Sequence, residues 1–137
     1  MMQRRMAMTR PESAEFGAIF DLATIEQELR GEEAYAREGH SARTLVREHD
    51  LRVVLIAIKA GSRVAAHTVD ETVSVQTLTG RLRVQLPRLA RQRGDGFVEL
   101  PIGRLLALEP GTEHAVEAIG DSAFLITFGW TVSPPAA

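Results

Sequence analysis

The sequence contains no cysteine. Disulfide bonds, thiolate metal sites and a cysteine nucleophile are therefore excluded. Any bound metal would have to use imidazole, carboxylate or amide-oxygen ligands, a donor set that suits Mn, Fe, Ni, Cu or Zn. Aromatic residues make up only 5% of the chain. This scarcity favours an interior with open space over one that is filled by large rings.

The chain also lacks an excess of positive charge and a long apolar run. Its 16 basic and 18 acidic side chains give a net charge of -2, which argues against a dedicated nucleic-acid binder. The longest apolar stretch, Val53–Ile58, is too short to span a bilayer. No apolar segment follows the basic residues Met1–Arg5, so we expect no signal peptide. We therefore expect a cytoplasmic protein with no nucleic-acid or membrane partner.

The remaining composition is that of a globular domain. Hydrophobic residues make up 45% and charged residues 25% of the 137 residues, and a chain of this size can bury a core without cross-links. We expect a flexible tail over residues 1–20 and a single domain over residues 21–137.

The first part of this domain has a helical period. Leu22, Ile25 and Leu29 recur at helical spacing, and Thr24 and Gln27 match a capping box. We expect helical structure over residues 22–37, with a break at Gly31.

From residue 42 to residue 130 the pattern changes to short β-branched runs separated by glycine, proline and aspartate. Such regular short strands predict an all-β sandwich or barrel. The expected strands are 42–47, 51–59, 63–69, 72–79, 81–87, 96–100, 104–108, 112–119 and 122–130. We expect hairpin turns at residues 48–50 and 79–80 and a long hairpin loop at residues 89–96.

Two of the expected strands, 51–59 and 122–130, are apolar on both faces. A strand with one face in water would alternate apolar and polar residues, so both faces must be covered. One face would line the interior. The other would pack on the N-terminal helix or on a second subunit, and we expect a homodimer.

A first motif begins at Gly61 and ends at Gly80. Five residues separate Gly61 from His67, and the spacing to Gly80 matches the first motif of the cupin superfamily, G-x5-H-x-H-x3,4-E-x6-G. The second histidine position is Val69, and the glutamate position is Val73.

A second motif runs from Gly103 to His114 and resembles the second cupin motif, G-x5-P-x-G-x2-H. Gly103, Gly111 and His114 match, whereas the proline position holds Glu109. The two motifs occur in the cupin order, and the resemblance covers roughly residues 39 to 130. It implies a cupin jelly-roll β-barrel.

The resemblance also implies a metal site inside the barrel. In cupins the H-x-H pair and the glutamate of the first motif meet the histidine of the second motif, which arrives from a strand across the barrel. Here only His67 and His114 remain as metal ligands, and Glu71 is a candidate for an extra ligand. The expected metal is one divalent Zn, Mn, Fe, Ni or Cu ion held weakly, and the alternative of no metal stays open.

Alternate residues of a strand share a face, which predicts an apolar pocket with imidazoles as its polar groups. Its expected lining is His67, Val69, Val73, Val75, His114 and Val116. Three functions fit this prediction: binding of a small molecule in the barrel, metal-dependent catalysis of the dioxygenase, isomerase or lyase type, and a structural or regulatory barrel without a ligand. The catalytic residues and the reaction stay unassigned.

Overall fold

The structure is a computed structural model that describes residues 12–14, 17–67 and 70–130, with the backbone alone at residues 12–14, 65–67, 90 and 93. Most of the described chain forms strands. They are β1 (Glu12–Ala14), β2 (Gly17–Ile19), β3 (His40–Arg47), β4 (Leu51–Ile58), β5 (Arg63–His67), β6 (Thr72–Thr79), β7 (Arg81–Gln85), β8 (Phe97–Pro101), β9 (Leu105–Leu108), β10 (His114–Ala118) and β11 (Ser122–Gly129). The helices are α2 (Leu22–Arg30), α3 (Glu33–Glu38) and α4 (Pro87–Arg93). In the described part of the chain, no helix has the length and apolar character needed to cross a membrane.

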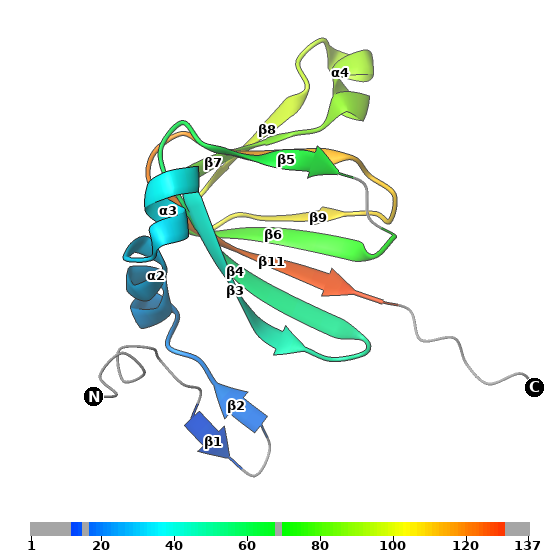
Figure 1. The fold of residues 1–137 in the computed structure, drawn as a ribbon. Coiled ribbons are helices and arrows are strands. Elements are labelled where there is room, and N and C mark those ends of the chain that lie inside the picture. Colours follow the sequence, from blue (N-terminus) through cyan, green and yellow to red (C-terminus); the bar gives the residue numbers. More distant parts are fainter. Residues whose placement is uncertain (1–11, 15–16, 68–69, 131–137) are drawn as a thin grey trace, which may run out of the picture.

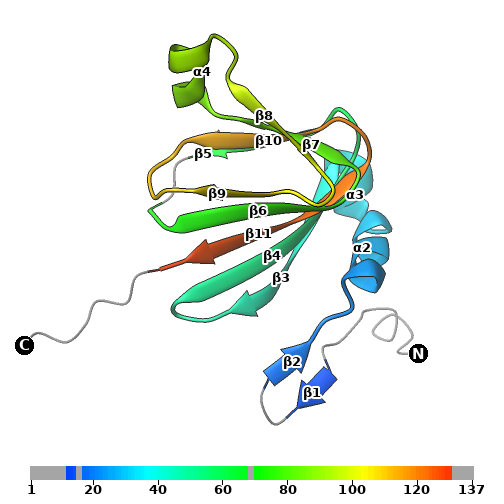
Figure 2. The ribbon, with the colours of Figure 1, turned by 180° about the vertical axis from the view of Figure 1, so that it is seen from behind.

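Two antiparallel sheets form the body of the molecule, which confirms the predicted all-β class. One sheet has the strand order β5-β10-β7-β8, and the other has the order β3-β4-β11-β6-β9. The sheets lie face to face, come together beside α3 and separate toward the opposite end (Figures 1 and 2).

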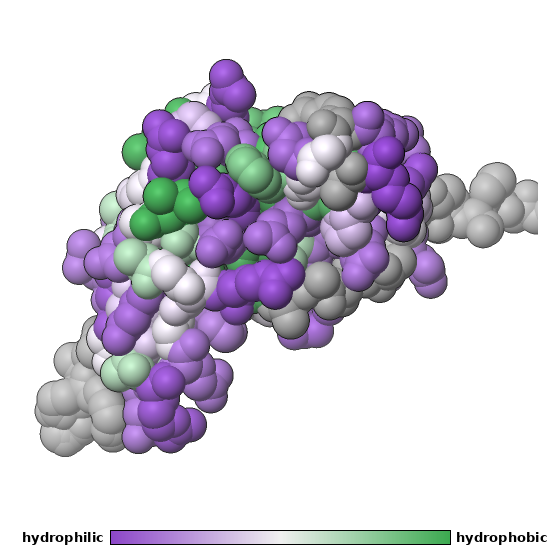
Figure 3. Space-filling model, turned by 90° about the horizontal axis from the view of Figure 1, so that it is seen from above, coloured by the Kyte–Doolittle hydropathy of each residue, from purple (hydrophilic) through white to green (hydrophobic). Residues whose placement is uncertain are grey.

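Alternation along the strands separates the core from the surface. On β6, Val73 and Val75 are buried in the core between the sheets, whereas Gln76 on the opposite face is exposed. The outer side of the four-stranded sheet carries charged residues, including the Arg81–Glu99 ion pair at 2.9 Å. The view from above is accordingly mostly hydrophilic, with separate apolar patches (Figure 3).

The two strands with two apolar faces, β4 and β11, are neighbours within the five-stranded sheet. Their inner side chains, such as Ile56 and Phe124, lie in the core between the sheets. On the outer face, Leu55 packs in a second cluster with Ile25 and Leu29 of α2. The N-terminal helix therefore covers this face, which was one of the two predicted solutions. The homodimer stays a prediction, to be checked by the mass of the protein in solution.

Helix α2 begins one residue after Asp21, whose side chain accepts a hydrogen bond from the Thr24 backbone N–H at 3.2 Å. The predicted capping box of Thr24 and Gln27 is wrong, because Asp21 caps the helix three residues earlier. The predicted break is confirmed, since Gly31 ends α2. Helix α3 then ends at Gly39, which has a φ of 89° in the left-handed region.

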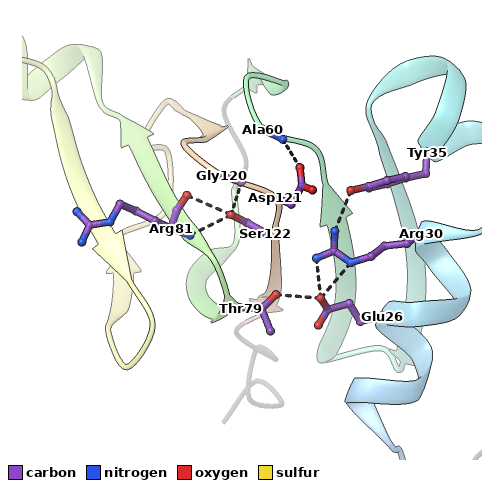
Figure 4. Close-up of polar contacts among 9 residues, drawn as sticks. All are labelled: Glu26, Arg30, Tyr35, Ala60, Thr79, Arg81, Gly120, Asp121 and Ser122. Atoms are coloured by element: carbon purple, nitrogen blue, oxygen red, sulfur yellow. Dashed lines mark hydrogen bonds and ion pairs between the residues drawn. The ribbon is translucent and has the colours of Figure 1, made fainter.

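A polar cluster fixes α2 to the barrel (Figure 4). Glu26 Oε2 accepts hydrogen bonds from Arg30 Nη2 at 2.6 Å and from Thr79 Oγ1 at 2.9 Å. Arg30 Nη1 also donates to Tyr35 Oη at 2.8 Å. Burial acts to lower the pKa of Arg30, but the hydrogen bonds and charges of Glu26 and Tyr35 outweigh it and raise the pKa. The guanidinium of Arg30 therefore stays charged.

The predicted hairpin turn at residues 79–80 is wrong. Strands β6 and β7 lie in different sheets, so the chain crosses from one sheet to the other at Gly80, where φ is 80°. The buried Ser122 closes this corner (Figure 4). Its Oγ accepts a hydrogen bond from Arg81 N at 3.0 Å and donates to Gly120 O at 2.7 Å.

Two other segments differ from expectation. The predicted loop at residues 89–96 holds most of helix α4, which Pro87 begins at a position where its missing N–H costs nothing. Leu89 of this helix packs against the core. Within the expected tail, β1 and β2 pair as a short antiparallel ribbon.

Candidate functional site

A cavity of about 190 Å³ lies between the two sheets. Its walls come from β3, β4 and β11 of the larger sheet and from β5 and β10 of the smaller one. The lining residues are Thr44, Arg52, Val54, Ile56, Val64, His114, Ala115, Val116, Phe124, Ile126 and Phe128. Most of this lining is hydrocarbon, and polar side-chain atoms come from only three of its residues, Thr44, Arg52 and His114.

His114 is 1% exposed at the start of β10. Its Nδ1 lies 3.1 Å from the backbone oxygen of Thr112. A carbonyl oxygen only accepts hydrogen bonds, so Nδ1 carries the proton of this contact. This is also the arrangement of metal-binding histidines, which donate their second ring N–H to a carbonyl or carboxylate.

Arg52 lines the cavity from β4, where it lies on the same inward face as Val54 and Ile56. Its guanidinium carbon lies 4.7 Å from the centre of the Phe128 ring and 5.6 Å from the centre of the Trp130 ring. The Nε atom is buried and has no hydrogen-bond partner among the described residues. Arg52 therefore brings a cation with unused donors to an otherwise apolar wall.

The structure brings His67 and His114 side by side. They are direct partners in the antiparallel pairing of β5 and β10. The expectation that residue 114 arrives from across the barrel is wrong, because β5 and β10 are neighbours in one sheet. The side chain of His67 and the whole of Val69 lie outside the described residues.

Of the valines predicted to line the site, one lines the cavity and two are buried elsewhere in the core. Val116 lines the cavity next to His114. Val73 and Val75 are buried on β6 in the core between the sheets, and neither belongs to the cavity lining. Glu71 is half-buried in the bend that precedes β6.

The metal site implied by the cupin motifs fits this chain only in part. Val73 occupies the glutamate position and offers no donor atom. Among the residues that the structure describes, no three histidine, aspartate or glutamate side chains gather as metal ligands. The sequence thus lacks two of the four motif ligands, with valine at positions 69 and 73 and histidine at positions 67 and 114.

Sequence reasoning missed Arg52. A signal was present, since Arg52 stands in the run Leu51–Ile58 with the same parity as Val54 and Ile56. One charged residue on the inward face of an apolar strand points to a polar contact in the interior.

Comparison with known proteins gives the fold its name. No protein-family profile and no curated protein sequence matches the chain. A conserved protein of unknown function from Streptococcus pyogenes superposes with a TM-score of 0.65 and 20% identity, covering 93% of this chain and 99% of the other. A cupin superfamily protein from Desulfitobacterium hafniense superposes with a TM-score of 0.66 and 14% identity, covering 90% and 100%.

The likeness extends to part of an oxalate decarboxylase from Bacillus subtilis. Its TM-score is 0.58 at 20% identity, over 67% of this chain and 26% of the enzyme. At these identities the similarity concerns the fold. The chain has the cupin β-barrel fold, which confirms the prediction from its two motifs.

Proposed function

We propose that this cupin-fold protein binds a small organic molecule in the cavity between its sheets. The observation that carries the proposal is the lining, an apolar wall with Arg52 and His114 as its charged and titratable groups. Small-molecule sites have this composition, because the apolar wall gives affinity and a few polar groups fix the orientation.

The cavity volume indicates the size of the ligand. An engineered protein cavity of about 150 Å³ with an apolar lining binds benzene. The cavity here, at about 190 Å³, has room for one ring or a branched chain with a small substituent. Apolar contacts with Ile56, Phe124 and Ile126 would provide most of the binding free energy.

A pair of valine variants tests this proposal. Val64 and Val98 both pack at the margin of the core, on the two edge strands of the four-stranded sheet, but only Val64 lines the cavity. We expect toluene to raise the melting temperature of the wild type and of Val98→Phe, because a ligand that binds only the folded state stabilises it. Val64→Phe should lose that increase, since its ring occupies the cavity.

Equal effects of toluene on both variants would place the binding elsewhere. No effect on any of the three proteins, in thermal melts and in NMR titrations, would favour the ligand-free structural or regulatory barrel.

A second candidate function is weak binding of a divalent metal by His67 and His114, with Glu71 as a further candidate ligand. The observation in its favour is the direct pairing of the two histidines on neighbouring strands. Residues paired in this way have Cβ atoms about 4.5–5.5 Å apart, close enough for two imidazoles to contact one ion. A metal-dependent reaction of the dioxygenase, isomerase or lyase type would depend on such an ion.

Metal content tests this second function. The untagged protein would be measured by elemental analysis after addition of Zn, Mn, Fe, Ni or Cu, beside the double variant His67→Ala/His114→Ala. We expect weak binding that the double variant loses and that Glu71→Gln reduces if this carboxylate is a ligand. Absence of metal from the wild type after these additions would rule the function out.

A further inference from the structure

Arg52 differs from the other half-buried arginines of the described residues, Arg30, Arg43 and Arg83, because each of those has a glutamate partner. Arg30 and Arg43 are each paired with glutamate, Arg30 with Glu26 at 2.6 Å and Arg43 with Glu28 at 2.7 Å. No ion pair and no hydrogen bond joins Arg52 to any of the described residues, and its Nε is buried. A buried donor without an acceptor is unfavourable, so native proteins rarely retain one.

The two aromatic rings leave the donors of Arg52 available. Phe128 and Trp130 attract the guanidinium through the faces of their rings, at 4.7 and 5.6 Å. The five N–H donors lie in the guanidinium plane, and stacking does not satisfy them. The rings therefore restrict the position of the charge while its hydrogen bonds stay unused.

The place of Arg52 in the fold brings its side chain to the cavity wall. Arg52 lines the same cavity as Ile56, Val116 and Ile126. A ligand whose apolar part lies among these residues would have its polar group beside a guanidinium. That group would be a planar anion, because the fork of N–H donors matches the two oxygens of a carboxylate.

We infer that the cavity selects organic carboxylates, with a single-ring or branched apolar body inside the barrel and the carboxylate hydrogen-bonded to Arg52. The inference rests on the proposed function, since it requires that the cavity bind a small molecule. It adds the chemical class of that molecule and the residue that recognises it.

Matched ligand pairs separate the charge from the shape. Benzoate and benzamide have the same ring and differ in charge, as do isovalerate and isovaleramide, and toluene reports on the apolar cavity alone. The proteins are the wild type, Arg52→Met, Arg52→Lys and Arg47→Met. Arg47 is the control because it is the exposed cross-strand partner of Arg52 on β3 and does not line the cavity.

In NMR titrations, we expect the wild type and Arg47→Met to bind one of the carboxylates about 10- to 100-fold more tightly than its amide, the range for a hydrogen bond to a charged group. Arg52→Met should lose this preference while it still binds toluene. Arg52→Lys should keep only part of it, because an ammonium lacks the planar fork.

Two results would overturn the inference, and they are distinguishable. If toluene binds but neither carboxylate is preferred, or if Arg52→Met keeps the preference, the cavity is a binding site and the ligand class is wrong. If neither toluene nor any carboxylate binds the wild type, the proposed function fails together with the inference.

Discussion

The two glycines of the first motif should respond very differently to the same substitution. Gly61 and Gly80 have nearly equal φ angles, 84° and 80°. A Cβ atom at Gly61 would meet nothing within 4 Å, whereas at Gly80 it would lie 2.3 Å from both Asp121 O and Ser122 Oγ. The backbone oxygen of Asp121 belongs to the corner between the sheets and has no rotamer that would move it aside.

The φ angles and the Cβ contact distances determine how much free energy of unfolding each variant should lose. An alanine in the left-handed region costs about 1–2 kcal/mol, which is the whole expected loss for Gly61→Ala. Gly80→Ala adds an overpacking penalty of about 1–3 kcal/mol and disturbs the hydrogen bond from Arg81 N to Ser122 Oγ. We therefore expect Gly80→Ala to lower the free energy of unfolding by about 2–5 kcal/mol.

Urea unfolding of the wild type and both variants measures this difference. If Gly80→Ala fails to fold while Gly61→Ala folds, the expectation is also met. Equal losses in the two variants would refute the reasoning, because they would show that the backbone angle alone matters and that the crossing at Gly80 tolerates a side chain.

Three further variants test how the N-terminal helix is attached, and a fourth, Leu105→Ala on β9, is their surface control. Leu29→Ala should lower the free energy of unfolding by about 2–5 kcal/mol, because Leu29 is 0% exposed, while Leu105→Ala, at a site 61% exposed, should change it by less than about 0.5 kcal/mol. Asp21→Ala removes the cap of α2 and should cost about 1 kcal/mol in the same urea titration; no loss would show that the cap is dispensable. Glu26→Gln leaves Arg30 without its carboxylate and should cost about 1–2 kcal/mol, discounted because both side chains are partly exposed; a cost that vanished in 1 M salt would instead indicate a screened surface pair.

Much of the barrel follows from periodicity. The alternation of Val73, Val75 and Gln76 assigns the two faces of β6, and the doubly apolar runs identify β4 and β11 as covered strands. These patterns are reliable because the side chains on the buried face of a strand are apolar along its whole length. The two motifs then indicate which barrel it is, a result that the superposed structures confirm.

Three features depend on contacts that periodicity does not encode. Gly80 looks the same in the sequence whether the chain turns back on its neighbour or crosses to the other sheet. Helix α4 depends on Leu89 packing against the core, which no pattern around its arginines reveals. The parity of Arg52 indicates an interior position, but its surroundings are seen only in the structure, where Phe128 and Trp130 lie beside it and no carboxylate of the described residues pairs with it.

Strand β3 is the longest edge of the barrel, with eight residues at the border of the five-stranded sheet. An open edge of this length invites another chain to add a strand, which is the first step toward aggregation. Arg43 and Arg47 place charges along this edge, and Arg43 is held by Glu28 and Glu32 from the helical segment. The ion pairs of Arg43 with Glu28 and Glu32 thus also keep a charge on this edge, which opposes strand addition by another chain. Variants that break these ion pairs should therefore first show a loss of solubility.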